Sequence, residues 1–219
     1  GLGGITGKIT SAPAAHLSVL CNQMVNFLGI MQNEWAGAQA FSSFDTYLAP
    51  FVKVDNLSYS EVKKCIEAFV YGVNTPSRWG TQAPFTNITL DWTVPNDLAE
   101  LPALVGGKEM DFCYKDCKKE MDMVNRAFLE TMIEGDANGR GFQYPIPTYS
   151  ITSDFDWSDN LNNQLLFDMT AKYGTPYFSN YINSDMEPSD VRSMCCRLRL
   201  DLRELRKKSG GFFGSGEST

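Results

Sequence analysis

The chain has 219 residues, of which 43% are hydrophobic and 21% are charged, and it contains 14 Phe, 9 Tyr and 4 Trp. So many aromatic side chains need burial, which excludes an intrinsically disordered chain. Its 18 Gly and 10 Pro follow no fixed period, which excludes a collagen-like chain. The net charge of −7 argues against a protein that binds nucleic acid non-specifically. No stretch approaches 18 uncharged apolar residues, so no membrane-spanning helix is predicted.

Six cysteines in 219 residues are too few for a disulfide scaffold. Residues 1–11 lack the basic and apolar regions of a signal peptide. We therefore expect a cytoplasmic protein in a reducing compartment. Because the sequence does not begin with Met and ends in a Gly/Ser-rich run, we also expect a piece of a larger protein.

Hydrophobic periodicity predicts helices that alternate with strands. Residues 17–35 carry apolar side chains at helical spacing, and residues 36–52 are predicted as a turn followed by a helix. Ser58 and Glu61 form the pattern of a capping box, and the helix behind them ends at Pro76. The remaining predictions are a strand at 85–93, a Pro/Gly loop at 96–107, a helix at 116–134, a strand at 142–152, a helix at 157–173 closed by Gly174 and a short strand at 176–182. This alternation predicts an α/β fold with a parallel sheet.

Histidine and cysteine side chains offer two candidates for chemistry, and each has a simpler explanation. His16 is the only histidine, and no nucleophile-elbow pattern accompanies it, so we expect it to cap or pack a helix. Cys113 and Cys117 lack the second pair or histidine that would complete a zinc site. We therefore predict two surface thiols there.

Acidic and glycine-rich segments are equally open to simple explanations. Three acids flank Trp157, namely Asp154, Asp156 and Asp159. They could form a metal site, but we favour acids at the N-terminus of a helix, where they complement the helix dipole. The glycine runs at residues 1–7 and 210–216 do not match a phosphate-binding loop. No metal site is predicted.

The segment from Arg192 to Asp201 is the most unusual one. It contains the adjacent pair Cys195 and Cys196, and arginines surround this pair. Cations stabilise a thiolate and attract anions. From spacing alone, two interpretations are about equally favoured: a basic helix or loop with one buried cysteine, and a reactive thiol beside a phosphate-bearing substrate. Residues 190–208 hold seven basic and three acidic side chains, but the acidic remainder of the chain argues against a polyanion binder.

Five sequence blocks, in order, resemble the catalytic subunit of anaerobic (class III) ribonucleotide reductase, a glycyl radical enzyme that acts on ribonucleoside triphosphates. The blocks are WAGAQAFSSFD at 35–45, QAPFTNIT at 82–89, FQYPIPTY at 142–149, PYFSN at 176–180 and residues 192–201. The similarity runs across essentially the whole chain. Five long blocks in register are far more specific than any single motif.

The resemblance implies the first half of a ten-stranded α/β barrel, in which parallel half-barrel strands alternate with helices, followed by a C-terminal finger-loop segment. Residues 1–219 would form a partial catalytic barrel domain, with dimer and effector-site helices at 1–57, half-barrel elements at 58–187 and the finger loop at 188–219. In that family, a finger-loop cysteine becomes a thiyl radical and removes the 3′ hydrogen of the ribose. The resemblance places Cys196 at this position, with Cys195 as the runner-up.

The function implied is the anaerobic reduction of ribonucleoside triphosphates to deoxyribonucleoside triphosphates, with this chain inactive without the remainder of the barrel. The implied partners are that remainder, the substrate, ATP and deoxynucleotide effectors, a radical-SAM activating enzyme and a second copy in a homodimer. No cofactor is expected in this segment, because the glycyl radical and a structural zinc belong to the missing C-terminal part. The alternative is a non-catalytic nucleotide-binding or dimerisation segment of the same assembly.

Overall fold

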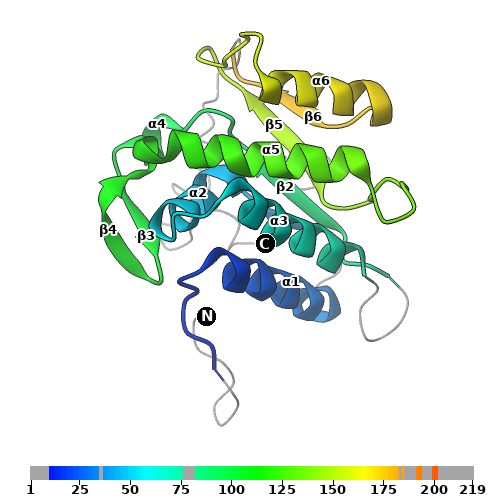
Figure 1. Ribbon diagram of the computed structural model, residues 1–219, viewed down its shortest axis with the longest axis horizontal. Helices are drawn as coiled ribbons and strands as arrows, with labels where there is room; N and C mark the ends of the chain where they lie inside the picture. The colour runs from blue at the N-terminus through cyan, green and yellow to red at the C-terminus, as the bar shows by residue number, and fades with distance from the viewer. Residues whose placement is uncertain are drawn as a thin grey trace.

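A four-stranded parallel sheet forms the centre of the computed structural model, which describes residues 10–34, 37–75, 82–182, 184, 191–193 and 199–201 (Figure 1). The strand order is β1-β2-β5-β6, and every neighbouring pair is parallel. The strands are β1 (Gln39–Phe41), β2 (Thr86–Leu90), β5 (Ile146–Ile151) and β6 (Tyr177–Asn180). The predicted α/β fold with a parallel sheet is confirmed.

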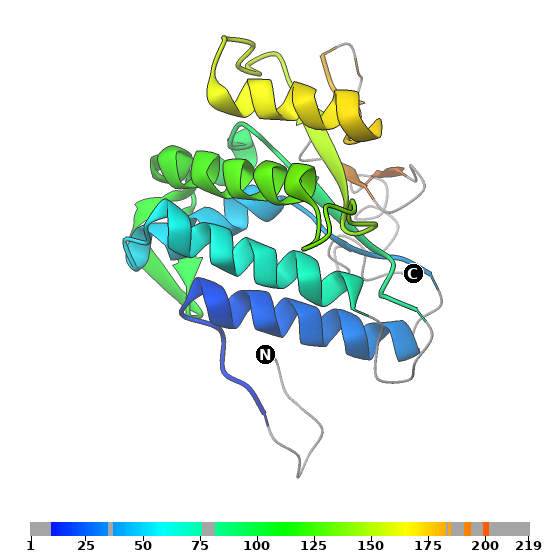
Figure 2. The same ribbon diagram turned by 45° about the vertical axis from the view of Figure 1, so that its right-hand side comes forward.

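Five long helices form a layer that packs against one face of the sheet, and the hydrophobic core lies between the two. They are α1 (Leu17–Glu34), α2 (Phe44–Val54), α3 (Tyr59–Asn74), α5 (Lys118–Glu134) and α6 (Leu161–Tyr173). Helix α3 packs against α1 and α5, and α5 packs against α2 and α6 (Figure 2). Ile88, Leu90 and Tyr149 of the sheet are fully buried in one cluster with Phe69 of α3 and Phe128 of α5.

Local signals set the helix ends, as predicted. The Ser58 backbone N–H donates to the Glu61 carboxylate at 2.8 Å, and the Glu61 N–H points back to the Ser58 hydroxyl, which completes the capping box. Helix α3 ends at Asn74, close to Pro76 in the sequence. Gly174, with φ of 66°, closes α6 in the left-handed conformation that glycine adopts without strain.

The second face of the sheet is polar. Leu90 pairs with Tyr149 on the face toward the helices, and successive side chains of a strand point to opposite faces. The other face of β2, β5 and β6 therefore carries mainly polar side chains, namely Asn87, Thr89, Thr148, Ser150, Tyr177 and Ser179, together with Ile146. Parallel sheets are normally covered on both faces, so a polar face indicates a surface built to meet a ligand or a further part of the protein.

Two predictions of local structure are wrong. Residues 39–41, predicted as part of a turn and the start of the helix after it, form β1, because their backbone pairs with β2. The predicted loop at 96–107 contains the short helix α4 (Asn96–Ala99) and strand β3 (Pro102–Val105). Strand β3 forms an antiparallel hairpin with β4 (Lys108–Cys113) through Gly106 and Gly107, both at positive φ, as a two-residue hairpin turn requires.

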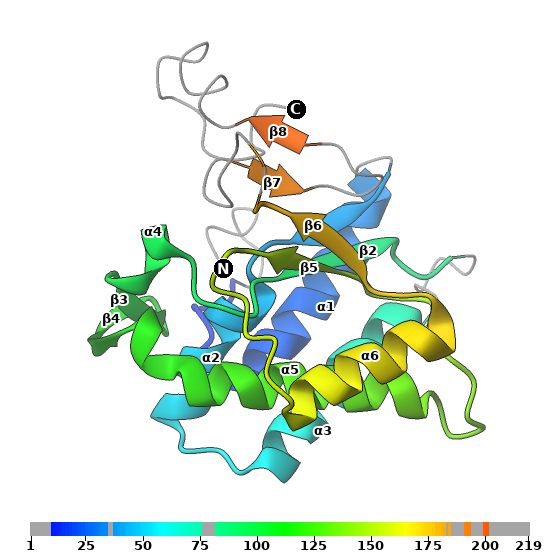
Figure 3. The same cartoon turned by 90° about the horizontal axis from the view of Figure 1, so that it is seen from above.

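A second antiparallel pair, β7 (Val191–Ser193) with β8 (Arg199–Asp201), follows the sheet in sequence. In the view from above, this pair lies on the far side of the sheet from α3 and α5, next to β6 (Figure 3). It therefore stands on the side of the sheet that carries the polar face.

Candidate active site at the carboxyl ends of the strands

A cavity of about 300 Å³ lies where β2, β5 and β6 end. It is lined by Asp91, which follows β2, by Ser150 of β5, by Thr152, which follows β5, and by Tyr181 and Ile182, which follow β6. Ligands of open parallel α/β sheets bind outside the carboxyl ends of the strands. The position of this cavity therefore makes it the candidate functional site.

The lining of the cavity is acidic and rich in hydroxyl groups. The described residues that line it are Asp91, Thr93, Val94, Pro95, Asn96, Asp97, Ser150, Thr152, Ser153, Asp154, Tyr181 and Ile182. The lining residues that the structure describes include three carboxyl groups and no Lys, Arg or His. These carboxyl groups attract hydrogen-bond donors.

A buried carboxylate in α2 holds the backbone on the β2 side of the cavity. Asp45 is fully buried and receives four hydrogen bonds: from the N–H groups of Asp91 (2.8 Å), Trp92 (2.9 Å) and Thr46 (3.0 Å), and from the Asn125 amide (2.9 Å). Burial raises the pKa of the Asp45 carboxyl, and these hydrogen bonds act in the opposite direction. The network joins β2, α2 and α5 behind the cavity.

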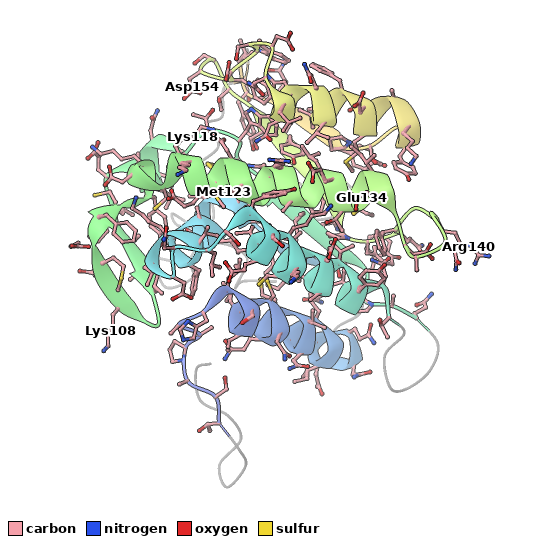
Figure 4. The ribbon with its side chains drawn as sticks, viewed as in Figure 1. Lys108, Lys118, Met123, Glu134, Arg140 and Asp154 are labelled. Carbon is pink, nitrogen blue, oxygen red and sulfur yellow. The ribbon has the colours of Figure 1, made fainter. Side chains whose placement is uncertain are left out.

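The turn after β2 has a shape that needs this support. Trp92 has a φ of 64°, a left-handed conformation that is costly for a bulky side chain. Its ring stacks on Phe155 at 5.5 Å between centroids and meets Tyr149 edge-on at 5.2 Å. Its carbonyl accepts a hydrogen bond from Lys118 at the start of α5. Lys118 lies at the start of α5, and Asp154 of the cavity lining lies in the loop between β5 and α6 (Figure 4).

The two predicted catalytic residues, Cys196 and its runner-up Cys195, lie outside the described residues. The register of the flanking hairpin is described: Val191 pairs with Asp201, and Ser193 pairs with Arg199. Five residues, 194–198, connect the two strands, and Cys196 is the third of these five in the sequence. The glycine runs at 1–7 and 210–216 also lie outside the described residues.

The remaining candidate residues have structural roles. His16 precedes α1 and contacts the Asp55 carboxylate through Nδ1 at 2.8 Å. Cys113 is half-buried, and Cys117 is buried with 1% exposure, so the prediction of two surface thiols is wrong for Cys117. Burial raises the pKa of the Cys117 thiol to about 11. The short 3₁₀ helix η1 (Tyr114–Cys117) turns this side chain inward.

The acids around Trp157 do not form a metal trio. Helix α6 begins at Leu161 rather than at 157, and Asn160 caps it through its side chain, so these acids precede the helix. Asp156 accepts the N–H of Ser158, and Asp154 accepts the Thr152 hydroxyl. Across the described part of the chain, no group of three or more His, Cys, Asp or Glu side chains could hold a metal ion.

A second cavity, of about 410 Å³, lies between α1 and α3 and is mostly apolar. Cys21 and Cys65 line it from opposite helices, and burial raises the pKa of the Cys21 thiol to about 12. Helix α1 lies within residues 1–57, where the effector-site helices are predicted. Within the described ranges, no helix is both long enough and apolar enough to cross a membrane.

The site residues that sequence reasoning missed are Asp45, Asp91 and Ser150. The signal for Asp91 is an acid directly after an apolar strand, whereas Asp45 gives no signal, because three of its four partners are 46 to 80 residues away.

Comparisons with solved structures identify the fold. The anaerobic ribonucleotide reductase from Thermotoga maritima in complex with dATP and CTP matches with a TM-score of 0.60 and 20% identity, over 86% of this chain and 33% of that chain. The same enzyme with glycerol in the active site gives 0.59 and 22%, over 83% and 30%. With citrate in the active site it gives 0.57 and 21%, over 81% and 32%. This chain thus spans about a third of those structures.

A search of curated proteins found no match. The family model described as "Anaerobic ribonucleoside-triphosphate reductase" matches residues 1–219, which is the whole chain. The chain belongs to the anaerobic ribonucleoside-triphosphate reductase family.

Proposed function

We propose that this chain forms the first half of the catalytic barrel of an anaerobic, oxygen-sensitive ribonucleoside-triphosphate reductase and acts together with the remainder of that barrel. The family match over residues 1–219 is the observation that carries the proposal. The four parallel strands with one polar face support a half-barrel, because that face would line the interior when the other half closes.

The proposed catalytic residue is Cys196. Its sulfur, as a thiyl radical, would take the 3′ hydrogen atom of the ribose, so that an S–H bond forms while a C–H bond breaks and a carbon radical remains. The 2′ hydroxyl would then take up a proton and leave as water, and a reductant, either formate or a dithiol protein, would supply two electrons and a proton to the 2′ carbon. The thiol would return its hydrogen atom to the 3′ carbon, which restores the thiyl radical. Abstraction of a hydrogen atom by a thiyl radical needs reach, orientation and exclusion of water rather than a general base. The five-residue connection between β7 and β8 supports a thiol on a narrow loop.

The remaining parts of the proposal concern partners and regulation. One Thermotoga maritima structure contains dATP in the specificity site, which supports effector binding by the helices within residues 1–57 of this chain. We further propose a cytoplasmic homodimer and a radical-SAM activating enzyme. The glycyl radical and the structural zinc would belong to the missing C-terminal part, and residues 188–219 would form the finger loop.

Two matched cysteine variants test the catalytic assignment. In the enzyme assembled with its remainder and activated without oxygen, Cys196→Ser is expected to abolish nucleotide reduction while nucleotide binding persists. Cys195→Ser is the control, and it should keep turnover. Full activity of Cys196→Ser would defeat the assignment, and loss of activity in Cys195→Ser alone would move the role to Cys195.

The second candidate function is a non-catalytic nucleotide-binding or dimerisation segment of the same assembly. It is favoured by one observation: the chain covers only about a third of its structural neighbours. Mixing this chain with a complementary C-terminal chain separates the candidates. Restored turnover after radical activation supports the reductase, whereas nucleotide binding without turnover supports the second candidate.

A further inference from the structure

The loop that connects β5 with α6 presents an exposed tryptophan. The Trp157 side chain is 60% exposed, although a side chain of this size is usually mostly buried. Its ring packs on Phe155 at 4.4 Å between centroids, and Phe155 stacks in turn on Trp92 at 5.5 Å. Phe155 and Trp92 are both buried, with exposures of 5% and 4%. The exposed ring therefore rests on two buried rings that support it from beneath.

Hydrogen bonds on both sides of Trp157 hold the loop in shape. The Asp156 carboxylate accepts the backbone N–H of Ser158 at 2.9 Å and the Asn160 amide at 3.1 Å. The Asn163 amide donates to the backbone carbonyls of Asp156 at 2.8 Å and Ser158 at 2.7 Å. Because the backbone and the ring are both held, little conformational entropy remains to be lost when a partner covers the ring.

Apolar and acidic side chains accompany the ring in the same short segment. Leu161, four residues after Trp157 and at the start of α6, is 47% exposed. Three acids of the loop are exposed, namely Asp154, Asp156 and Asp159. Residues 151–171 contain no Lys, Arg or His. Lys118 of α5 is near enough to act on Asp156, but it is already paired with Asp122.

These side chains define the Trp157 surface, which consists of Trp157, Leu161 and the three exposed acids of the loop. Large exposed aromatic side chains that are held in place are typical of the centre of a protein interface, and charged side chains are typical of its rim. The acids select the charge of the partner. An arginine or lysine can lie over the face of an indole ring and pair with a carboxylate beside it, whereas an acidic segment would be repelled.

Two observations favour the remainder of the same protein as this partner. The chain spans about a third of the structures that it resembles, so most of their length lies outside it and is available to cover the ring. A second copy of the chain is a poor match for an acidic surface, because its own net charge is −7.

We propose that the Trp157 surface is a docking site for a basic segment of the remainder of the protein. An arginine or lysine of that segment stacks on the Trp157 ring and pairs with the acids of the loop. The existence of this remainder rests on the proposed function. The basic character of the segment rests on the Trp157 surface alone.

The affinity of this chain for the remainder, supplied as a separate chain, tests the docking site. Trp157→Ala is expected to weaken binding about tenfold to a hundredfold, as is typical of a central aromatic residue in an interface. Asp159→Asn should weaken it about twofold to fivefold at low salt and less at high salt, because the attraction of a rim charge is screened. Trp157→Phe keeps an aromatic ring that binds cations less strongly, and it should weaken binding about threefold.

Two exposed side chains elsewhere in the chain serve as matched controls. Leu104 on β3 is 50% exposed, and Glu109 is exposed on β4. Leu104→Ala and Glu109→Gln should leave the affinity for the remainder unchanged. Urea unfolding of every variant shows whether it is folded. If Trp157→Ala does not fold, Trp157→Phe and Asp159→Asn still decide.

Several outcomes would overturn the docking site. Unchanged affinity in Trp157→Ala would do so, and so would the absence of any association of the wild-type chain with the remainder. Tighter binding by Asp159→Asn would indicate an acidic partner. Self-association that Trp157→Ala removes would assign the surface to a second copy instead. Association that Trp157→Ala weakens, in an activated mixture without turnover, would defeat the proposed function and leave the docking site standing.

Discussion

The carboxylate of Asp45, in the first turn of α2, accepts the backbone N–H of Trp92 at 2.9 Å, just beyond the end of β2. Trp92 has a φ of 64°, so this bond holds the chain in a conformation that a tryptophan rarely adopts. The same carboxylate accepts the N–H of Asp91 at 2.8 Å. One buried side chain thus sets the direction in which the chain leaves β2 and enters the cavity wall.

Substitution of Asp45 is therefore expected to be costly. In Asp45→Asn, an amide donor replaces a carboxylate oxygen, so at least one of the four converging donors is left buried without an acceptor. We expect a loss of about 2–3 kcal/mol in the free energy of unfolding, measured by urea denaturation. Asp159→Asn should stay within about 0.5 kcal/mol of the wild type. An Asp45→Asn variant as stable as the wild type would show that the network does not hold the turn.

The origin of each structural element explains what sequence reasoning can predict. Helix α3 begins at a capping box that lies within four residues, and α6 ends at Gly174, so both ends are encoded locally. Strand β1 has only three residues, and its conformation depends on pairing with β2, more than 40 residues away. Gly106 and Gly107 are a local signal for the β3–β4 hairpin. Because prolines lie nearby, the same segment is also typical of an irregular loop, which is what was predicted.

The candidate site also depends on contacts between residues that are distant in the sequence. Asp45 and Asn125 are 80 residues apart, and no periodicity or motif brings them together. Their contact exists only because α2 and α5 pack side by side. The assignment of Cys196 came from family resemblance, since spacing and charge alone left its role open. In the structure, strands β7 and β8 stand on either side of it in the sequence.

Close packing between α1 and α3 gives a second prediction. A Cβ on Gly72 would lie 2.7 Å from Cγ2 of Val25, and a β-branched side chain in a helix has little freedom to move aside. Gly72→Ala is expected to destabilise the chain by about 1–3 kcal/mol through overpacking. The additional substitution Val25→Ala should recover part of this loss.

Gly29 of α1 is the matched control, because a Cβ there would meet nothing within 4 Å. Gly29→Ala is expected to stabilise the chain by about 0.5–1 kcal/mol, since alanine loses less conformational entropy in a helix. Thermal or urea unfolding of both variants measures the contrast. Equal effects of the two substitutions would mean that the α1–α3 contact is looser than described.

Thiol reactivity gives a third prediction. Burial raises the pKa of Cys21 to about 12 and that of Cys117 to about 11, so both thiols lack the thiolate form that reacts with alkylating agents near pH 8. Cys113 is half-buried and should be modified first of the three. Mass spectrometry of peptides after timed iodoacetamide treatment measures the order. In denaturant the three should react alike, and rapid labelling of Cys21 in the folded chain would contradict its burial.

The capping box of α3 makes stability depend on pH in a specific direction. Hydrogen bonds from the Ser58 backbone and hydroxyl lower the pKa of Glu61 below its usual 4.5. A carboxyl group with a lowered folded-state pKa stabilises the fold above its unfolded pKa, and this contribution is lost as the pH falls through the lowered value. Glu61→Gln should therefore be less stable than the wild type at pH 7, and the difference should shrink on acidification below about pH 4.

The control for Glu61→Gln is a carboxyl group that caps no helix. Glu109 is exposed on β4, and Glu109→Gln should differ little from the wild type in stability at pH 7. Urea midpoints between pH 7 and pH 3 measure both variants. A gap between Glu61→Gln and the wild type that stays constant over this range would mean that the charge of Glu61 contributes nothing, and that the cap acts through hydrogen-bond geometry alone.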